Sequence, residues 1–293
     1  MEEATETIIE VRKELIVSPS GRNPTLRNGH FLRPSIPSST IHVQLPSPSF
    51  FSTTTSSEPG KSPVNVKFTG CLNPLKNWNT WVDHMHSKHE STWKRSGIYQ
   101  AIMGSTCENQ RNKDLILVLA EKWCRETNTF VFPWGEATIT LEDIMVSGGF
   151  SVLGSPIFSA LETPELKEIE ERLIQARSAR QYPWLMHFME SESELEREAF
   201  LSLWLSRFVF PGISKGTITE LVFPIAIHLA RGTRLALAPA VLASIYRDLS
   251  VLKAKIVALI ELESYNEKEN GLAIALSAPF ELVRNWAWVL GEI

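Results

Sequence analysis

The stretch from Trp123 to Gly154, WCRETNTFVFPWGEATITLEDIMVSGGFSVLG, decides the fold because its hydrophobic pattern changes period. β-Branched and aromatic residues flank Pro133-Trp134-Gly135, which predicts a β-hairpin over Phe130 to Thr140. Thr140 and Asp143 have the spacing of a helix N-cap with an acid at the third helical position. Gly148-Gly149 predicts where that short helix ends. The stretch therefore predicts a small β element among helices.

Apolar residues recur at helical spacing on both sides of this stretch. Residues Leu115 to Trp123 are apolar on nearly every side and predict a buried helix. Two further helices are expected over Ala238 to Leu262 and Leu272 to Leu290. An early helix is predicted to have an apolar face made of Trp78, Trp81, Val82 and Met85. An amphipathic helix is predicted after Pro164, and its apolar face consists of Leu166, Ile169 and Leu173.

Two more segments have the spacing of capping boxes, Ser191 to Glu194 and Thr217 to Glu220, each ahead of an apolar run. Pro224 is expected to kink or restart the second helix. The pattern from residue 64 to residue 293 predicts a single α-helical domain with a small β-hairpin, so the fold class is mainly α.

Residues 1 to 63 have a different composition. From Ser18 to Pro63, 24 of 46 residues are Ser, Thr or Pro. This segment has too few large apolar residues to offset the entropy of ordering, so a disordered leader is expected. Ile8, Ile9, Val11 and Leu15 lie among charged residues and predict a short helix before it. The acidic N-terminus lacks the features of a secretory signal.

The charge balance limits the function classes. The chain has 29 Lys and Arg against 33 Asp and Glu, a formal charge of −4, so nucleic-acid binding would need a local basic patch. No stretch has the length and apolarity of a membrane span. Three widely spaced cysteines, Cys71, Cys107 and Cys124, lack a CxxC pair and indicate a reducing compartment rather than a disulfide framework.

The main candidate for chemistry is a histidine cluster, His84, His86 and His89. Three imidazoles within six residues are a possible metal site, and a metal-dependent hydrolase is the alternative function that they carry. On the expected helix His86 and His89 are i, i+3 neighbours while His84 points elsewhere, so a surface cluster is the preferred interpretation.

Other candidates are interpreted as structural. Cys107 and Cys124 have no local base, and Cys124 is expected to be a small core residue. His187 and His228 are expected to be buried or half-buried. Phosphate-loop and nucleophile-elbow motifs are absent. Core packing is also predicted for four tryptophans: Trp123, Trp204, Trp286 and Trp288.

The Trp123 to Gly154 stretch resembles the plant mobile domain family, which includes the MAIN-like proteins. Leu201 to Leu249 and the closing segment PFELVRNWAWVLGEI are similar to the same family. The chain ends soon after Trp288, whereas longer relatives continue, which is expected of a short paralogue or a truncated product. The residues that carry the resemblance, interpreted as structural, are Trp123, Thr127, Thr129, Phe130, Gly135, Glu136, Thr140, Leu141, Glu142, Asp143, Gly154, Arg231, Gly232, Trp286 and Trp288.

The resemblance implies a nuclear protein of transposon origin that acts in transposon silencing, developmental gene expression or meristem maintenance. It implies nuclear protein partners, among them other plant mobile domain proteins or a phosphoprotein-phosphatase-like protein. An older aminotransferase label would require a Schiff-base lysine, and Lys122, Lys167 and Lys215 have no phosphate cup, so no cofactor is expected. The preferred function is a non-enzymatic interaction module, with DNA binding as a further alternative.

Overall fold

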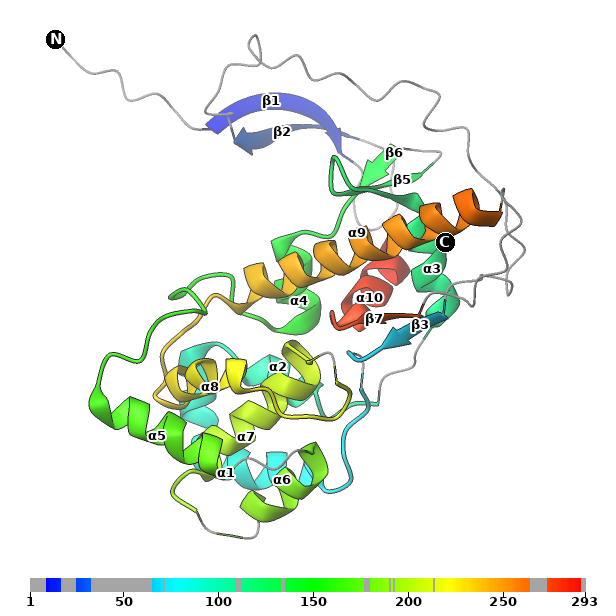
Figure 1. The fold of residues 1–293 in the computed structure, drawn as a ribbon. Coiled ribbons are helices and arrows are strands. Elements are labelled where there is room, and N and C mark those ends of the chain that lie inside the picture. Colours follow the sequence, from blue (N-terminus) through cyan, green and yellow to red (C-terminus); the bar gives the residue numbers. More distant parts are fainter. Residues whose placement is uncertain are drawn as a thin grey trace, which may run out of the picture. The chain divides into compact units, whose positions relative to one another are not determined.

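The computed structural model describes residues 9–16, 25–32, 65–70, 72–108, 112–132, 135–176, 180–189, 191, 193–212, 214–263 and 273–290. The chain divides into two units, Met1–Ser57 and Glu58–Ile293. Figure 1 shows the helices and the short strands of the second unit, which is mainly helical as the sequence predicts.

The first unit contains an antiparallel strand pair, β1 (Ile9–Ile16) and β2 (Thr25–Leu32), with Ile9 opposite Leu32 and Ile16 opposite Thr25. The short helix predicted here is therefore wrong. The segment is short, and its apolar residues Ile9, Val11 and Leu15 all lie at even spacing, which is the side-chain period of a strand. Most of the predicted leader, residues 17–24 and 33–64, lies outside the described residues.

The first helices of the second unit follow their apolar patterns. Helix α1 (Trp78–Ser96) buries Trp78, Trp81, Val82 and Met85 completely, which confirms the predicted face. It ends at Gly97, whose φ of 73° is the left-handed conformation that closes a helix. Helices α2 (Tyr99–Gly104) and α3 (Lys113–Lys122) follow, and α3 ends one residue before the predicted end at Trp123.

The predicted hairpin is present and is part of a larger sheet. Strands β5 (Thr129–Phe132) and β6 (Gly135–Ala137) are antiparallel, with Phe130 opposite Ala137, and β4 (Trp123–Cys124) pairs with the other edge of β5. Helix α4 (Leu141–Gly148) then begins at Thr140 with a complete capping box, in which the Thr140 hydroxyl accepts from the Asp143 amide and the Asp143 carboxylate accepts from the Thr140 amide. Gly149 ends this helix as predicted.

Helices α5 (Pro164–Gln175) and α6 (Gln181–Met189) lead to α7 (Glu196–Trp204), a π-helical turn (Leu205–Val209) and α8 (Phe223–Ala230). Ile169 and Leu173 of α5 are buried as predicted. The two capping boxes are wrong, because α7 begins after Leu195 and α8 follows a short 3-10 turn, Glu220–Val222, without a side-chain cap. Pro224 lies in the first turn of α8, where its missing N–H has no helical partner to lose, so it restarts the helix.

The long helix α9 (Leu237–Glu263) confirms the prediction for residues 238 to 262, and α10 (Phe280–Leu290) follows a strand. That strand, β7 (Ala273–Leu276), pairs in parallel with β3 (Asn65–Phe68), Asn65 opposite Ala273. The predicted helix over Leu272 to Leu290 is thus wrong at its beginning. A strand of four residues with a partner over two hundred residues away has no local signal.

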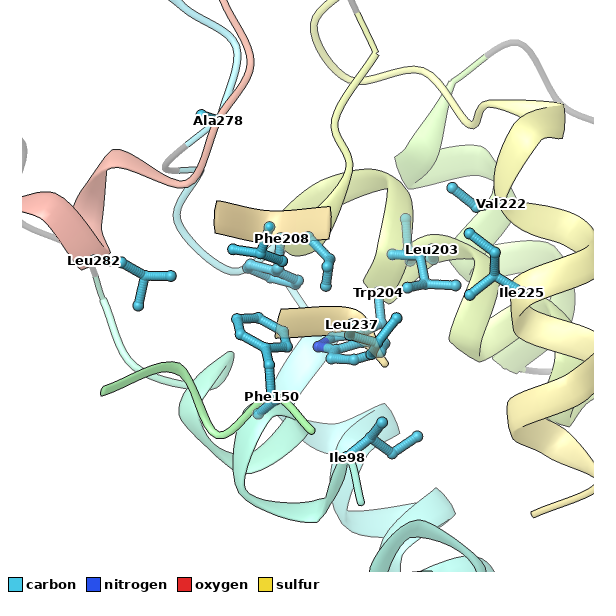
Figure 2. Packing of buried hydrophobic residues seen from close by; sticks show 14 of the residues in the cluster. Ile98, Phe150, Leu203, Trp204, Phe208, Val222, Ile225, Leu237, Ala278 and Leu282 are labelled. Atoms are coloured by element: carbon cyan, nitrogen blue, oxygen red, sulfur yellow. The ribbon is translucent and has the colours of Figure 1, made fainter. Parts of the chain in front are cut away.

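One apolar core runs through the second unit. Figure 2 shows Phe150, Trp204 and Phe208 with Leu237 at its centre, from segments far apart in the sequence. The Phe150 and Trp204 rings lie 6.4 Å apart, and Trp78 stacks on Phe200 at 4.9 Å. Aromatic side chains bury large areas in such arrangements, which accounts for the high tryptophan content of this chain. Among the described helices, none has the length and apolar character that crossing a membrane requires.

Candidate functional site

The three histidines of the cluster, for which a metal site is the alternative interpretation, have different partners. His84 Nε2 lies 2.8 Å from Lys88 Nζ and 3.6 Å from Glu196 Oε1. The His86 ring lies against the rings of Trp93 and Tyr99, and its Nε2 lies beside the Glu90 carboxylate. Within the part of the chain that the structure describes, no three His, Cys, Asp or Glu side chains group as metal ligands.

His89 differs from the other two in its electrostatic surroundings. Burial lowers the pKa of His89 below its ordinary value, and the positive charges of Arg197 and Lys88 lower this pKa further. Glu198 and Glu196 act in the opposite direction but do not outweigh these effects. His89 therefore favours its neutral form at the packed contact between α1 and the start of α7.

A buried carboxylate, Glu196, joins the same two helices. Its Oε1 accepts a 3.0 Å hydrogen bond from the indole Nε1 of Trp81, and Lys88 Nζ lies 3.8 Å from its Oε2. Arg197 binds Glu198, which is also buried, at 3.1 Å. The sequence analysis singled out neither acid, because residue spacing does not show which polar side chains tertiary packing will bury.

A second buried polar group lies on the π-helical turn. Arg207 Nη1 donates to Gln181 Oε1 at 2.7 Å, and the same guanidinium donates to the Asn73 carbonyl. Gln181 Nε2 in turn donates to the carbonyls of Ser206 and Thr217. These bonds satisfy a charge that would be costly to bury alone, so the group holds the turn in place.

The residues of the family resemblance lie mostly around the three-stranded sheet. The Phe130 ring lies 4.9 Å from that of Trp123 and 5.0 Å from that of Trp286, and Trp123 Nε1 donates to Ser250 Oγ on α9 at 2.9 Å. Thr129 Oγ1 donates to Glu136 across the hairpin at 2.8 Å, and lies 2.7 Å from Thr127 Oγ1. These contacts join β4, β5 and β6 to the helices beneath them.

Trp288 is the exception, and the prediction that it packs in the core is wrong. Its side chain is 74% exposed, whereas Trp286 is buried. Two residues along a helix turn about 200°, so the two rings of the Trp-Ala-Trp motif must lie on opposite sides of α10. The burial expected of all four tryptophans holds for Trp123, Trp204 and Trp286.

Two other residues differ from their predicted burial. His187 is exposed, because α6 turns it away from the core, whereas His228 is half-buried as predicted, with Nε2 3.2 Å from the Ser159 carbonyl. Cys124 is half-buried on the short edge strand β4, not in the core, and its Sγ lies 3.3 Å from Glu126. Helix α3 ends at Lys122, before Cys124, so the helical pattern could not predict whether the Cys124 side chain faces the core.

Lys253 was not singled out from the sequence. Its Nζ donates to the Glu121 carbonyl at 2.6 Å, at the C-terminal end of α3, and burial lowers the pKa of Lys253 below its ordinary value. A cation at the end of a helix compensates the carbonyls that have no helical partner. This contact explains a half-buried lysine without any reaction at its amine.

An apolar cleft of about 260 Å³ opens beside α8. Its lining combines the loop after Gly154, the chain after the π-helical turn and the first turns of α8, with Ile157, Phe210, Pro211 and Ile225 among its walls. Two large side chains of this lining, Phe158 and Leu221, are 85% and 80% exposed. Large apolar groups at such exposure are typical of surfaces that other molecules cover.

One basic group, Arg247, lies in this mostly apolar lining, together with the hydroxyl residues Thr219, Ser244 and Ser277. It donates to Asp248 at 2.8 Å and to Ser277 Oγ at 3.0 Å, while more than half of its side chain stays exposed. Asp248 is buried and accepts from the amides of Ser277 and Ala278, so it holds the chain between β7 and α10 against α9. The side of the cleft at Ser277 is therefore fixed, and Arg247 is the charged group of the lining.

The comparisons with known proteins agree with the resemblance. The plant mobile domain profile matches residues 97–290. The chain is 48% identical over 54 residues to Protein MAINTENANCE OF MERISTEMS, 50% over 46 residues to Protein MAIN-LIKE 1 and 49% over 49 residues to Protein MAIN-LIKE 2, all of Arabidopsis thaliana.

Those three alignments cover 18%, 16% and 17% of this chain and 11%, 9% and 7% of the relatives. No solved structure matches the chain. The family profile spans the helices from α2 to α10, together with the cleft and the three-stranded sheet. The chain belongs to the plant mobile domain family.

Proposed function

We propose that this chain is a non-enzymatic protein-interaction module whose cleft beside α8 receives an apolar segment of a partner. The observation that carries the proposal is the pair Phe158 and Leu221, both in the lining of the cleft and both almost fully exposed. Covering two such side chains contributes about 2 kcal/mol each, as for other large apolar groups removed from water. Exposed apolar groups beside a cleft are a feature of protein-interaction surfaces.

The proposed setting is the nucleus, in transposon silencing, developmental gene expression or meristem maintenance. This part rests on family membership and on the name of the relative MAINTENANCE OF MERISTEMS. The proposed partners are nuclear proteins, including other plant mobile domain proteins or a phosphatase-like protein. Because the aligned segments are short parts of the relatives, the proposal concerns the module and not their whole activity.

Affinity purification from plant nuclei tests both parts. Tagged wild-type chain is expected to recover a reproducible set of nuclear proteins, and the double variant Phe158→Ser, Leu221→Ser is expected to lose at least one of them while remaining folded. The matched control is Met145→Ser, Val146→Ser, which removes two exposed apolar side chains from α4. Exclusion of the chain from nuclei, or an equal loss of partners in the control, contradicts the proposal.

A further inference from the structure

Two exposed arginines, Arg95 and Arg234, lie where the last turn of α1 approaches the loop between α8 and α9. Arg95 Nη2 donates to the Arg231 carbonyl at 3.2 Å. The Arg95 guanidinium lies against the backbone of Gly232, where any Cβ would overlap it. The side chain of Arg95 is therefore held at the end of another helix, far from its own in sequence.

Arg234 makes the reciprocal contact. It lies against Gly97, where a Cβ would be 3.0 Å from Arg234 Nε and 3.3 Å from Nη2. Gly97 and Gly232 both have left-handed backbones, with φ of 73° and 81°, which glycine adopts without strain. Each arginine thus lies on the glycine beside the other arginine, and we call this surface the Arg95–Arg234 junction.

The charge of the junction is not neutralised. Two more cations flank it, and each has an exposed acid: Lys94 pairs with Glu90 at 2.6 Å and Arg231 with Glu165 at 3.1 Å. Among the described residues, no carboxylate forms a salt bridge with Arg95 or Arg234. A local excess of positive charge therefore remains on a chain whose formal charge is −4.

Most hydrogen-bond donors of the two guanidinium groups are also unused. The one side-chain bond of Arg95 within the described residues goes to the Arg231 carbonyl, and Arg234 makes none there. A guanidinium has five N–H donors in a planar fork that matches two oxygens of a phosphoryl group. Because its bond to the Arg231 carbonyl already orients Arg95, binding an anion would cost that side chain less entropy than a free arginine.

We propose that the Arg95–Arg234 junction binds a phosphoryl group carried by a segment of a partner protein. A phosphorylated side chain has a charge of about −1.5 to −2 and three acceptor oxygens, which suit two neighbouring forks. The flanking acids Glu90 and Glu165 limit the patch to a small anion. A long nucleic-acid backbone would need a wider basic surface and would be opposed by the net negative charge.

The junction and the cleft share a connecting segment. The Ser155 amide donates to the Arg234 carbonyl at 2.9 Å, and the Ala236 amide donates to the Ser155 carbonyl at 3.0 Å. Phe158 follows three residues later, at most about 10 Å along the chain. A partner segment of several residues is long enough to contact both places. The inference thus rests on the proposed interaction function and adds a chemical feature of the partner.

Fluorescence anisotropy with the full chain tests the proposal. The probe is a labelled degenerate peptide pool with a central phosphoserine, compared with the same pool containing serine and with a labelled 20-base-pair duplex DNA. We expect the phosphorylated pool to bind most tightly and inorganic phosphate to compete with it. Arg95→Gln, Arg234→Gln should weaken this binding at least about tenfold, since a hydrogen bond to a charged group contributes about 1.5–3 kcal/mol.

The matched control is Lys113→Gln, Arg125→Gln, which removes the same charge elsewhere. Arg125 is distant from the junction. Its neighbour Trp123 binds Ser250 on α9, and Ser250 lies about 20 Å along that helix from the end nearest the junction. If the double variant of the junction unfolds, Arg234→Gln alone replaces it. This substitution keeps the backbone carbonyl that accepts from the Ser155 amide, and the Arg234 side chain forms no hydrogen bond within the described residues.

Four results overturn the proposal: no binding of the phosphorylated pool, equal binding of the serine pool, tighter binding of duplex DNA, or an equal effect of the control variant. Phe158→Ser, Leu221→Ser is measured in the same assay. If it leaves competition by inorganic phosphate unchanged but loses nuclear partners, the cleft and the junction act separately. If it keeps its partners while the junction variant loses the phosphorylated pool, the cleft proposal fails and the phosphoryl site stands.

Discussion

At the residue scale, Glu196 shows how a buried charge is kept by its partners. Its carboxylate accepts from Trp81, whose ring is fully buried, and Lys88 and His84 lie within 4 Å. The helical pattern correctly predicted that Trp81 is buried, but it contains no information about what its indole N–H would bind. Polar partners in a core are set by tertiary packing, which residue spacing alone does not encode.

Glu196→Ala is expected to destabilise the fold by about 3 kcal/mol, because it leaves the Trp81 N–H buried and unpaired and removes the counter-charge of Lys88. Glu196→Gln keeps an acceptor and should cost less. Urea unfolding followed by tryptophan fluorescence measures both. Exposed Glu168→Ala on α5 serves as the control and should change stability by less than about 0.5 kcal/mol. Equal stability of Glu196→Ala and wild type would contradict the assignment.

The Trp-Ala-Trp motif gives a second residue-scale prediction. Trp286→Ala removes a buried ring that packs 5.0 Å from Phe130 and should cost about 3–5 kcal/mol. Trp288→Ala removes an exposed ring and should cost less than about 0.5 kcal/mol. Thermal unfolding of the two variants compares them directly. Similar losses in both would place Trp288 in a packed environment, as the sequence pattern suggested.

At the element scale, the predictions that were confirmed rest on local signals. The apolar face of α1, the N-terminal cap of α4 and the β5–β6 hairpin each depend on residues that are close together in the sequence. The errors have a different physical origin. Ser191 and Thr217 have cap-like spacing, but Thr217 donates to Ser214, and Ser193 rather than Ser191 accepts from the Leu195 amide. A hydroxyl near a helix can serve several turns, so spacing overestimates caps.

Thr140→Ala tests the cap that is present. The variant loses the acceptor for the Asp143 amide and should destabilise the fold by about 1 kcal/mol, whereas Thr140→Ser should keep most of that stability. Thr217→Ala, at a predicted cap that the structure does not form, is the matched control. Chemical denaturation of the three variants is the measurement. A loss in Thr217→Ala as large as in Thr140→Ala would argue against the observed helix start.

The contact of α1 with α7 should be sensitive to pH through His89. Since its folded pKa is lowered, the unfolded chain binds the proton more readily, so the stability from neutral His89 is present above about pH 6.5 and is lost as pH falls through the folded pKa. Urea midpoints from pH 7.5 to 5 should fall more steeply for wild type than for His89→Gln. The control variant His187→Gln, at an exposed histidine, should show the same pH dependence of the urea midpoint as wild type. If His89→Gln shows that same pH dependence, the assigned burial of His89 is contradicted.

At the scale of the whole molecule, the fold joins segments from both ends of the described second unit. Strand β3 pairs with β7, and the Thr69 amide and hydroxyl both donate to the Leu276 carbonyl. Local patterns predicted neither strand, because a four-residue strand is specified by its partner. The cleft and the Arg95–Arg234 junction were equally hidden, since each combines segments from different elements. The sequence thus determined the mainly α class and most helices, but not the surfaces that the fold assembles.

Asp248 connects this pairing to the longest helix. Its Oδ2 accepts from the amides of Ser277 and Ala278, at 2.7 and 2.8 Å, so Asp248→Ala leaves two amides beside the core without their acceptor. We expect a loss of about 2–4 kcal/mol and faster hydrogen exchange over β7 and the start of α10 than over α1. Exposed Asp83→Ala is the control. Uniform acceleration over the second unit, or none over residues 273–285, would show that α9 does not hold this end of the fold through Asp248.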